Sequence, residues 1–286
     1  LPLILDDLSL KIRPGQYVAI VGRTGCGKST LLRLLLGFEK PQKGAIYYDG
    51  KDLERIDLRS LRRRIGVVMQ NGKLFQGDIY SNIVISAPWL SQQDAWEAAE
   101  LTGIAEDIRR MPMGMNTVIS EGSGGISGGQ RQRIGIARAL IMQPEFIVAD
   151  EPISALDVSI RAQVLNLLND LKKSRGLTYL FIAHDLSVVR FISDRIAVIH
   201  KGRIVELSEA EELFRHPLHP YTKSLLSAVP NPDPAIERNK KLVVYDPSIH
   251  DYSTDKPQWV EIIPGHFVYG NEKELDGYRE ELAKKA

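Results

Sequence analysis

The chain has 286 residues, of which 43% are hydrophobic and 26% are charged. This is an ordinary globular composition, enough for one large core or for one core with an appendage, so disorder throughout is excluded. Lys and Arg number 37 against 36 Asp and Glu, and the net charge of +1 gives no electrostatic argument for nucleic acid as the main partner.

Membrane insertion and cysteine chemistry are also disfavoured. No apolar run reaches the roughly 18 to 20 residues that span a bilayer, and residues 1–5 are too short for the apolar part of a signal peptide. We therefore expect a cytoplasmic chain. Cys26 is the only cysteine, so an internal disulfide is excluded and no iron–sulfur cluster is expected.

The first elements predict a strand, a glycine-rich turn and a helix. Residues 17–21 and 45–48 are apolar and rich in β-formers. Glycine-rich residues 22–27 lead directly into a helical pattern over 28–36, which Gly37 ends. A strand, a glycine loop and a helix in this order form the context that a phosphate-binding loop requires.

The middle of the chain is expected to be a helical insert. Residues 66–69 predict a short buried strand before it. Residues 91–101 and 104–110 then predict helices, with Trp89 and Trp96 as packing residues.

Helices and buried strands alternate after the insert. A helical pattern over 130–141 precedes apolar strands at 146–149 and 179–182, and a predicted helix over 159–173 separates these strands. Alternation of this kind favours an α/β fold with a parallel sheet.

The last part of the chain changes character. Residues 208–212 predict a capped helix start, and several prolines then punctuate a connector. Short strands are predicted at 241–245, 259–263 and 266–269, followed by a charged helix over 272–285. We expect an accessory element outside the catalytic core.

Residues 22–29 fit the phosphate-loop pattern G-x-x-x-x-G-K-[ST] in full. Glycines let successive backbone N–H groups turn inward around phosphates at a helix N-terminus, where the dipole favours anions. A chance glycine-rich turn is the alternative, and the flanking strand and helix oppose it. Lys28 is expected to reach the β and γ phosphates, Ser29 to ligate Mg²⁺, and Cys26 to be a filler rather than a redox switch. The expected nucleotide contacts are Gly22, Thr24, Gly25, Cys26, Gly27, Lys28, Ser29 and Thr30.

Two carboxylates follow the apolar run 146–149. Asp150 and Glu151 would lie at the carboxyl end of a strand, where α/β sheets bind ligands. Asp150 is expected to bind Mg²⁺, and Glu151 to polarise the attacking water as general base. A solvated helix start is the alternative for an arbitrary Asp-Glu pair.

Residues Ser127-Gly128-Gly129-Gln130 head a basic, apolar-striped helix between the phosphate loop and the carboxylates. This motif resembles the signature of ATP-binding cassette (ABC) ATPases, in which two chains close on ATP and each signature completes the partner's site. The resemblance implies that the Ser127 hydroxyl and the N–H groups of Gly128, Gly129 and Gln130 bind the γ phosphate. A glycine hinge or a plain helix cap is the alternative.

The same resemblance assigns three further residues. Gln70 resembles the Q-loop glutamine that touches Mg²⁺ or the water, and His184 resembles the switch histidine that contacts the γ phosphate. Alone, either residue would be a structural or surface side chain. Residues 154–157 resemble the D-loop, which crosses the dimer interface, and a helix N-cap at Asp157 is compatible with that role.

The cassette resemblance covers residues 3 to about 205, and its two halves resemble different branches. Residues 5 to about 140, with Glu121 as the X-loop glutamate, are similar to peptide or bacteriocin exporters. The remainder is similar to the ATPase subunit of an oligopeptide importer. A chimera with its seam before residue 146 is the favoured interpretation, with natural divergence as the alternative. The adenine-stacking aromatic of the family is not in this sequence, so we expect ATP binding about ten- to a hundredfold weaker.

These observations predict a P-loop NTPase fold of the α/β class. The expected architecture is a RecA-like mixed sheet with an N-terminal antiparallel β subdomain, a helical insert subdomain and a small C-terminal accessory region. The predicted divisions are an ATP-binding core of residues 1–85 and 143–206, a helical signature subdomain of residues 86–142, and an oligopeptide-importer-like accessory region of residues 207–286.

The predicted function is Mg²⁺-ATP binding and hydrolysis as the nucleotide-binding domain of an ABC transporter related to peptide transport. The metal ligands are Ser29, Gln70 and Asp150, and the catalytic residues are Glu151, His184 and Gln70. Expected partners are ATP, a second cassette and permease subunits on the inner face of the membrane. A recombined cassette that binds nucleotide weakly without driving transport is the alternative. Cassette ATPases of DNA repair or translation are disfavoured by the neutral charge and the lack of a coiled-coil insertion or a second cassette.

Overall fold

The computed structural model describes residues 4–70, 73–119, 125–154, 156–230, 238 and 240–285. The chain forms two compact units. The first, here called the phosphate-loop unit, comprises Leu1–Ile12, Gln16–Leu31 and Ala183–Ala286. The second, here called the signature unit, comprises Arg13–Gly15 and Leu32–Ile182. Helices and strands occur in both units, so the predicted α/β class is confirmed.

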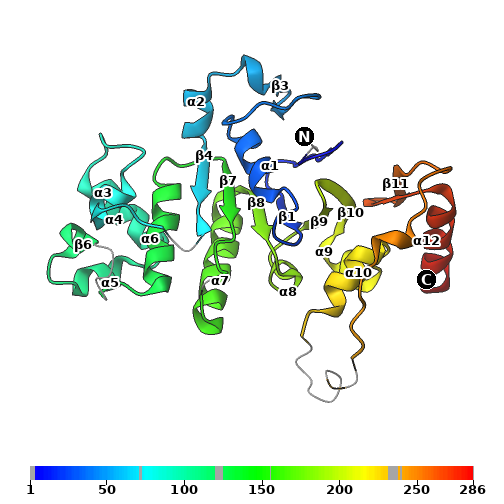
Figure 1. The fold of residues 1–286 in the computed structure, drawn as a ribbon. Helices are drawn as coiled ribbons and strands as arrows, with labels where there is room; N and C mark the ends of the chain where they lie inside the picture. Colours follow the sequence, from blue (N-terminus) through cyan, green and yellow to red (C-terminus); the bar gives the residue numbers. More distant parts are fainter. Residues whose placement is uncertain are drawn as a thin grey trace. The chain divides into compact units, whose positions relative to one another are not determined.

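The phosphate-loop unit is built on a sheet of mixed direction (Figure 1). Strand β1 is parallel to β9, and β9, β10, β12 and β11 then follow as antiparallel neighbours. All five residues of β1 are buried, because both faces of this strand are covered. The strands are β1 (Tyr17–Val21), β9 (Arg195–His200), β10 (Arg203–Glu209), β11 (Gln258–Ile263) and β12 (His266–Gly270).

Short helices complete this unit. Helix α12 packs on β11 and β12 through a small apolar cluster of Leu218, Val268, Leu275 and Tyr278. Helix α1 follows the glycine-rich turn and runs from one unit into the other. The helices are α1 (Lys28–Leu35), α8 (Leu186–Val189), α9 (Ala210–Arg215), α10 (Pro220–Ser227), α12 (Glu272–Lys285) and the 3₁₀ turn η4 (Pro247–Ile249).

Two predictions for the tail require correction. A helix begins within residues 208–212, as predicted, but it starts at Ala210 without a side-chain cap, because Ser208 and Glu209 belong to β10. Residues 241–245 form no strand, and the apolar side chains of Leu242 and Val244 are exposed to solvent. The tail is joined to the rest of the phosphate-loop unit by the pairing of β12 with β10. β-propensity predicts a strand only where a partner strand is available.

The signature unit contains three parallel strands and two small antiparallel pairs. Strand β7 lies between β4 and β8, and the carboxyl ends of all three point the same way. The pairs are β2 with β3 and β5 with β6. The strands are β2 (Tyr47–Tyr48), β3 (Lys51–Asp52), β4 (Ile65–Val68), β5 (Gly77–Asp78), β6 (Val118–Ile119), β7 (Phe146–Asp150) and β8 (Thr178–Ala183).

The predicted helical insert is confirmed as a cluster of helices with its own apolar core (Figure 1). Ile79, Ile104 and Ile134 are fully buried in it. Trp96 packs against this core, as predicted, but Trp89 is 62% exposed, with the guanidinium of Arg63 over its ring. The helices of the unit are α2 (Leu58–Arg63), α3 (Ile79–Ile83), α4 (Gln92–Leu101), α5 (Ala105–Arg110), α6 (Gly128–Leu140), α7 (Val158–Arg175) and the 3₁₀ turns η1 (Leu53–Arg55) and η3 (Gly114–Asn116).

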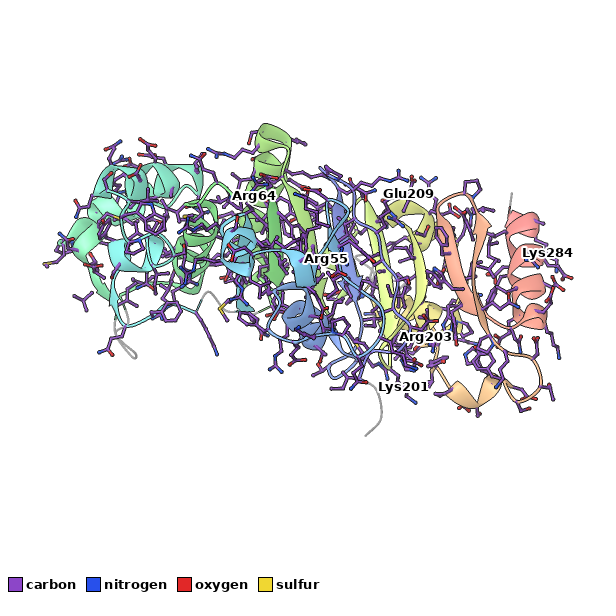
Figure 2. All side chains as sticks on the ribbon, turned by 90° about the horizontal axis from the view of Figure 1, so that it is seen from above. Arg55, Arg64, Lys201, Arg203, Glu209 and Lys284 are labelled. Atoms are coloured by element: carbon purple, nitrogen blue, oxygen red, sulfur yellow. The ribbon has the colours of Figure 1, made fainter. Side chains whose placement is uncertain are left out.

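A buried carboxylate on β10 ties the tail of the phosphate-loop unit together. Glu206 is fully buried and accepts hydrogen bonds from the backbone N–H groups of Leu218 and His219, at 2.8 and 3.0 Å. Its side chain also lies 2.8 Å from Nε2 of the buried His266 on β12. A buried carboxylate is costly unless it is paired, so these contacts fix where α10 begins. Figure 2 shows Arg203 and Glu209 at opposite ends of the same strand.

His219 caps the first turn of α10. Its Nδ1 accepts a hydrogen bond from the Tyr221 backbone N–H at 3.1 Å, which requires an unprotonated Nδ1. Burial lowers the pKa of His219 to about 3, with further lowering by the charges of His250, His200 and Lys223. The neutral imidazole is therefore the form that the folded unit holds.

Gly66 in β4 is expected to tolerate no side chain. An added Cβ would lie 2.7 Å from the backbone oxygen of Ala139 in α6 and 3.1 Å from Pro144. We expect Gly66→Ala to lower the free energy of unfolding by about 1 to 3 kcal/mol through overpacking, as measured by urea denaturation. Gly277→Ala in α12 is the control, because open space surrounds it and helix propensity predicts about 0.5 to 1 kcal/mol of stabilisation. Equal effects of the two substitutions would contradict this account.

The pKa of His219 predicts a loss of stability in mild acid. An unfolded histidine has a pKa of about 6.5, so below that pH the unfolded chain binds more protons than the folded one and the free energy of unfolding falls. The slope reaches about 1.4 kcal/mol per pH unit for one histidine. We expect the free energy of unfolding of His219→Asn to fall less steeply than that of the wild type between pH 6.5 and 4, because asparagine caps helices but does not titrate. Parallel curves for the two proteins, measured by urea denaturation at each pH, would exclude this assignment.

Candidate functional site

The glycine-rich turn between β1 and α1 has a backbone that only glycine adopts easily. Gly25 and Gly27 have φ values of +83° and +106°. A Cβ on Gly27 would lie 2.5 Å from Leu5 Cδ2, and a Cβ on Gly22 would overlap the backbone oxygen of Ile199. Glycine is thus required in residues 22–27 for two reasons: the backbone adopts positive φ angles, and Leu5 and Ile199 leave no room for a side chain.

Lys28 lies inside this curve. Its side chain is only 7% exposed, and Nζ donates to the carbonyl oxygens of Gly22 and Arg23 at 2.6 and 3.2 Å. Thr24, Gly25 and Ser29 are exposed at the surface of the turn, while Thr30 is half-buried. A buried ammonium at a helix N-terminus forms a site suited to an anion.

Cys26 is buried in the loop beside Lys28. Burial raises the pKa of its thiol, although the neighbouring Lys28 charge opposes this effect. A thiol kept protonated and out of solvent is a poor nucleophile, which supports the interpretation of Cys26 as a filler position.

The predicted carboxylates lie at the carboxyl end of β7. The register pairs Ala149 with Val68 of β4, and Asp150 with Ile182 of β8. Asp150 is half-buried and ends the strand. Glu151 follows it, and its backbone N–H donates to the carbonyl oxygen of Ile182 at 2.9 Å.

Glu151 has a φ of +44°, an unusual conformation for a residue with a side chain. Such strain persists where surrounding contacts impose it, and it concentrates at functional sites. Here Gln70 Nε2 donates to Glu151 Oε2 at 3.0 Å and lies 3.4 Å from Ser154 Oγ. The structure therefore brings Gln70 and Glu151 together at one edge of the parallel strands.

The signature motif begins α6. Ser127 is the N-cap: its hydroxyl accepts from the Gln130 N–H at 3.2 Å, and Gln130 Oε1 accepts from the Ser127 N–H at 2.9 Å. Gly129 has no room for a side chain, because a Cβ would lie 2.6 Å from Ile160 in the first turn of α7. Ser127 and Gly128 are exposed, so the positive end of a 13-residue helix faces solvent.

Asp157 and His184 are the remaining predicted site residues that the structure describes. Asp157 is the N-cap of α7, with Oδ1 accepting from the Ile160 N–H at 3.0 Å, so the capping alternative is confirmed. His184 is exposed and directly follows β8. The Glu121 prediction and part of the 154–157 motif, at Ala155, lie outside the described residues, as do residues 71 and 72.

Two contacting residues were not found by the sequence analysis. Ser154 lies beside Gln70 and was noted only as the first residue of a loop motif. Tyr221 accepts a hydrogen bond from the Arg23 backbone N–H at 3.2 Å, across 198 positions of the chain. No local pattern indicates a contact over that separation, although Tyr221 lies in a segment that the sequence analysis matched to importer tails.

Comparison with known proteins places this geometry in a family. The profile described as "ABC transporter" matches residues 5–154, which include the phosphate loop, Gln70, the signature and Glu151. The chain belongs to the ABC transporter family. A second profile, "Oligopeptide/dipeptide transporter, C-terminal region", matches residues 205–256.

Relatives extend over almost the whole chain. The oligopeptide transport ATP-binding protein OppF of Streptococcus pyogenes serotype M1 is 50% identical over 287 residues, covering 95% of this chain and 90% of its own. AmiF of Streptococcus pneumoniae is also 50% identical, with the same coverage. OppF of Bacillus subtilis is 43% identical, covering 96% and 92%. A solved bacterial Atm1-family ABC exporter with ATP bound has a TM-score of 0.68 and 37% identity over 74% of this chain and 36% of its own.

Family membership settles the fold and the reaction class. The chain is the nucleotide-binding domain of an ABC transporter and an ATPase, with the predicted P-loop NTPase fold. Single relatives align across the proposed seam, so the chimera hypothesis and its bacteriocin-exporter half receive no support. In the part of the chain that the structure describes, no helix is long and apolar enough to cross a membrane.

Glu151→Gln tests the assignment of the general base. We expect turnover to fall by about 10² to 10⁴, because the amide cannot accept a proton from water, while ATP binding is kept. Glu145→Gln is the matched control, since Glu145 is an exposed carboxylate at the other end of β7. The measurement is phosphate release at saturating MgATP, and unchanged turnover in Glu151→Gln would eliminate Glu151 as the base.

Proposed function

We propose that this ABC ATPase hydrolyses ATP in composite sites between two cassettes and drives oligopeptide transport. The observation that carries the proposal is the strained Glu151, held by Gln70 at the carboxyl end of β7. A carboxylate fixed at this edge of a parallel sheet is suited to orient the attacking water.

The nucleotide is proposed to bind through the loop of residues 22–30. Its backbone N–H groups and Lys28 would hold the phosphates, with contacts from Gly22, Thr24, Gly25, Cys26, Gly27, Ser29 and Thr30. The Ser29 hydroxyl, the Gln70 amide oxygen and the Asp150 carboxylate would hold Mg²⁺, and hard oxygen donors of this kind fit that ion. Bound Mg²⁺ neutralises charge that develops on the transferred phosphoryl group.

The second half of each site is proposed to come from a partner cassette. Ser127 and the N–H groups of Gly128, Gly129 and Gln130 form an exposed helix start that suits a γ phosphate offered from outside the chain. His184 would contact the same phosphate from the chain that binds ATP. Asp157 would lie at the dimer interface while it caps α7.

Oligopeptide transport is proposed from the relatives and from the tail. Curated relatives named as oligopeptide transport ATP-binding proteins match both the cassette and the segment 205–256. We infer that the chain works with permease subunits at the inner face of the cell membrane. We also propose the division into a core of residues 1–85 and 143–206, a signature subdomain of residues 86–142 and a tail of residues 207–286.

Complementation between two inactive variants tests the composite site. Lys28→Ala removes the phosphate-binding ammonium, and Gly128→Asp places a negative charge where the γ phosphate would approach. Position 128 tolerates a Cβ, which would lie 3.6 Å from Leu156, and an acidic residue at a helix start favours folding.

Each variant alone is expected to lose about 10²-fold in turnover. A mixed dimer contains one site with an intact loop and an intact signature, so an equimolar mixture is expected to regain about a quarter of the wild-type rate. The measurement is the ATPase rate before and after mixing at fixed total protein. A mixture no faster than the mean of its components would contradict the composite site.

A further inference from the structure

The tail of the chain contacts the phosphate loop directly. The backbone N–H of Arg23, the second residue of the loop, donates to the hydroxyl of Tyr221 at 3.2 Å. Tyr221 lies in the first turn of α10 and is 1% exposed. Both residues belong to the phosphate-loop unit. A tail side chain thus satisfies a backbone donor of the loop that otherwise requires water.

Several contacts fix the position of Tyr221. The cap from His219 Nδ1 to the Tyr221 N–H holds the residue at the start of α10. The N–H groups of Leu218 and His219 in turn bind the buried Glu206 on β10, which also contacts His266 on β12. The hydroxyl is therefore the end of a chain of hydrogen bonds that starts in the sheet.

The Tyr221 ring packs against His200, which precedes a turn that contacts the loop at Cys26. Its centroid lies 4.2 Å from that of His200, the last residue of β9. Two residues further on, the Gly202 backbone N–H donates to the Cys26 carbonyl oxygen at 3.0 Å. The loop is thus bound from outside at Arg23 and at Cys26, while Lys28 binds it from within.

We propose that Tyr221 is a positioning residue for the phosphate loop, through which the tail sets the affinity of this ATPase for nucleotide phosphates. The inference rests on the proposed assignment of residues 22–30 as the nucleotide site. A loop without the Arg23 hydrogen bond samples additional conformations, and apparent affinity falls in proportion to the binding-competent fraction. Tyr221 bonds to the backbone of the loop rather than to reacting atoms, so the chemical step keeps its rate.

Tyr221→Phe removes the acceptor and keeps the ring. We expect the Kd for MgADP, measured by titration calorimetry on the full chain, to rise about three- to tenfold. The KM for MgATP is expected to rise by the same factor, with kcat at saturation changed less than about twofold. A purely structural contribution would lower the active fraction and hence kcat without this division between KM and kcat.

Tyr245→Phe is the matched control. The ring of Tyr245 packs against Tyr221 with centroids 5.3 Å apart, and no hydrogen bond joins its hydroxyl to the described residues of the loop. We expect its Kd to equal that of the wild type. Equal weakening in both variants would overturn the proposal, because it would show a general effect of the ring cluster.

Amide hydrogen exchange tests the contact without any substitution. In ligand-free wild type the Arg23 amide is expected to be protected although Arg23 lies at the surface, and Tyr221→Phe should remove this protection. An unprotected Arg23 amide in the wild type would overturn the proposal, even if the variant folded poorly.

Lys28→Ala separates this inference from the assignment on which it rests. Loss of MgADP binding in Lys28→Ala together with wild-type affinity in Tyr221→Phe would refute the role of Tyr221 alone. Wild-type affinity in Lys28→Ala would instead refute residues 22–30 as the nucleotide site.

Discussion

The candidate site depends on the tight curvature of the phosphate loop, which close contacts at Gly22 and Gly27 and the hydrogen bonds of Lys28 maintain. The loop reverses direction between β1 and α1, and a side chain on Gly22 would overlap the backbone at the end of β9. The buried ammonium of Lys28 is bound by the carbonyl oxygens of the loop itself, which offsets part of the cost of burying that charge. The fold alone thus places a buried ammonium at a helix N-terminus, an arrangement that suits an anion, and close contact with β9 helps to hold the loop in its curved conformation.

A second constraint lies in the signature unit, where the carboxylate proposed as the general base, Glu151, has a strained backbone conformation. Glu151 has a positive φ because its N–H binds β8 while its side chain binds Gln70. Gln70 lies two residues after β4 and Glu151 one residue after β7, so the parallel pairing of these two strands brings the residues together. A substitution that displaced Gln70 would remove its hydrogen bond to Glu151, so the positions of the two side chains are energetically linked.

The sequence predicted what depends on local pattern and missed what depends on distant contacts. Strands β1, β7 and β8 and the capped start of α6 were predictable because apolar runs and capping residues act over a few positions. Residues 241–245 were predicted wrongly, since an apolar run forms a strand only beside a partner. The chimera hypothesis rested on short motifs, each of a few residues, whereas single relatives align with 95% of the chain. The contact of Tyr221 with Arg23 spans 198 positions and leaves no local pattern.

The buried Glu206 connects the tail to the sheet of the phosphate-loop unit. A carboxylate with no exposed surface is tolerated because two backbone N–H groups and His266 surround it, and all of these partners come from the tail. Without the tail, Glu206 would be left on β10 as an uncompensated charge beside the strand that packs against the phosphate loop. Strand β10 and the tail segment that contacts the phosphate loop are therefore linked through Glu206, so a loss of stability in the tail is expected to destabilise the loop as well.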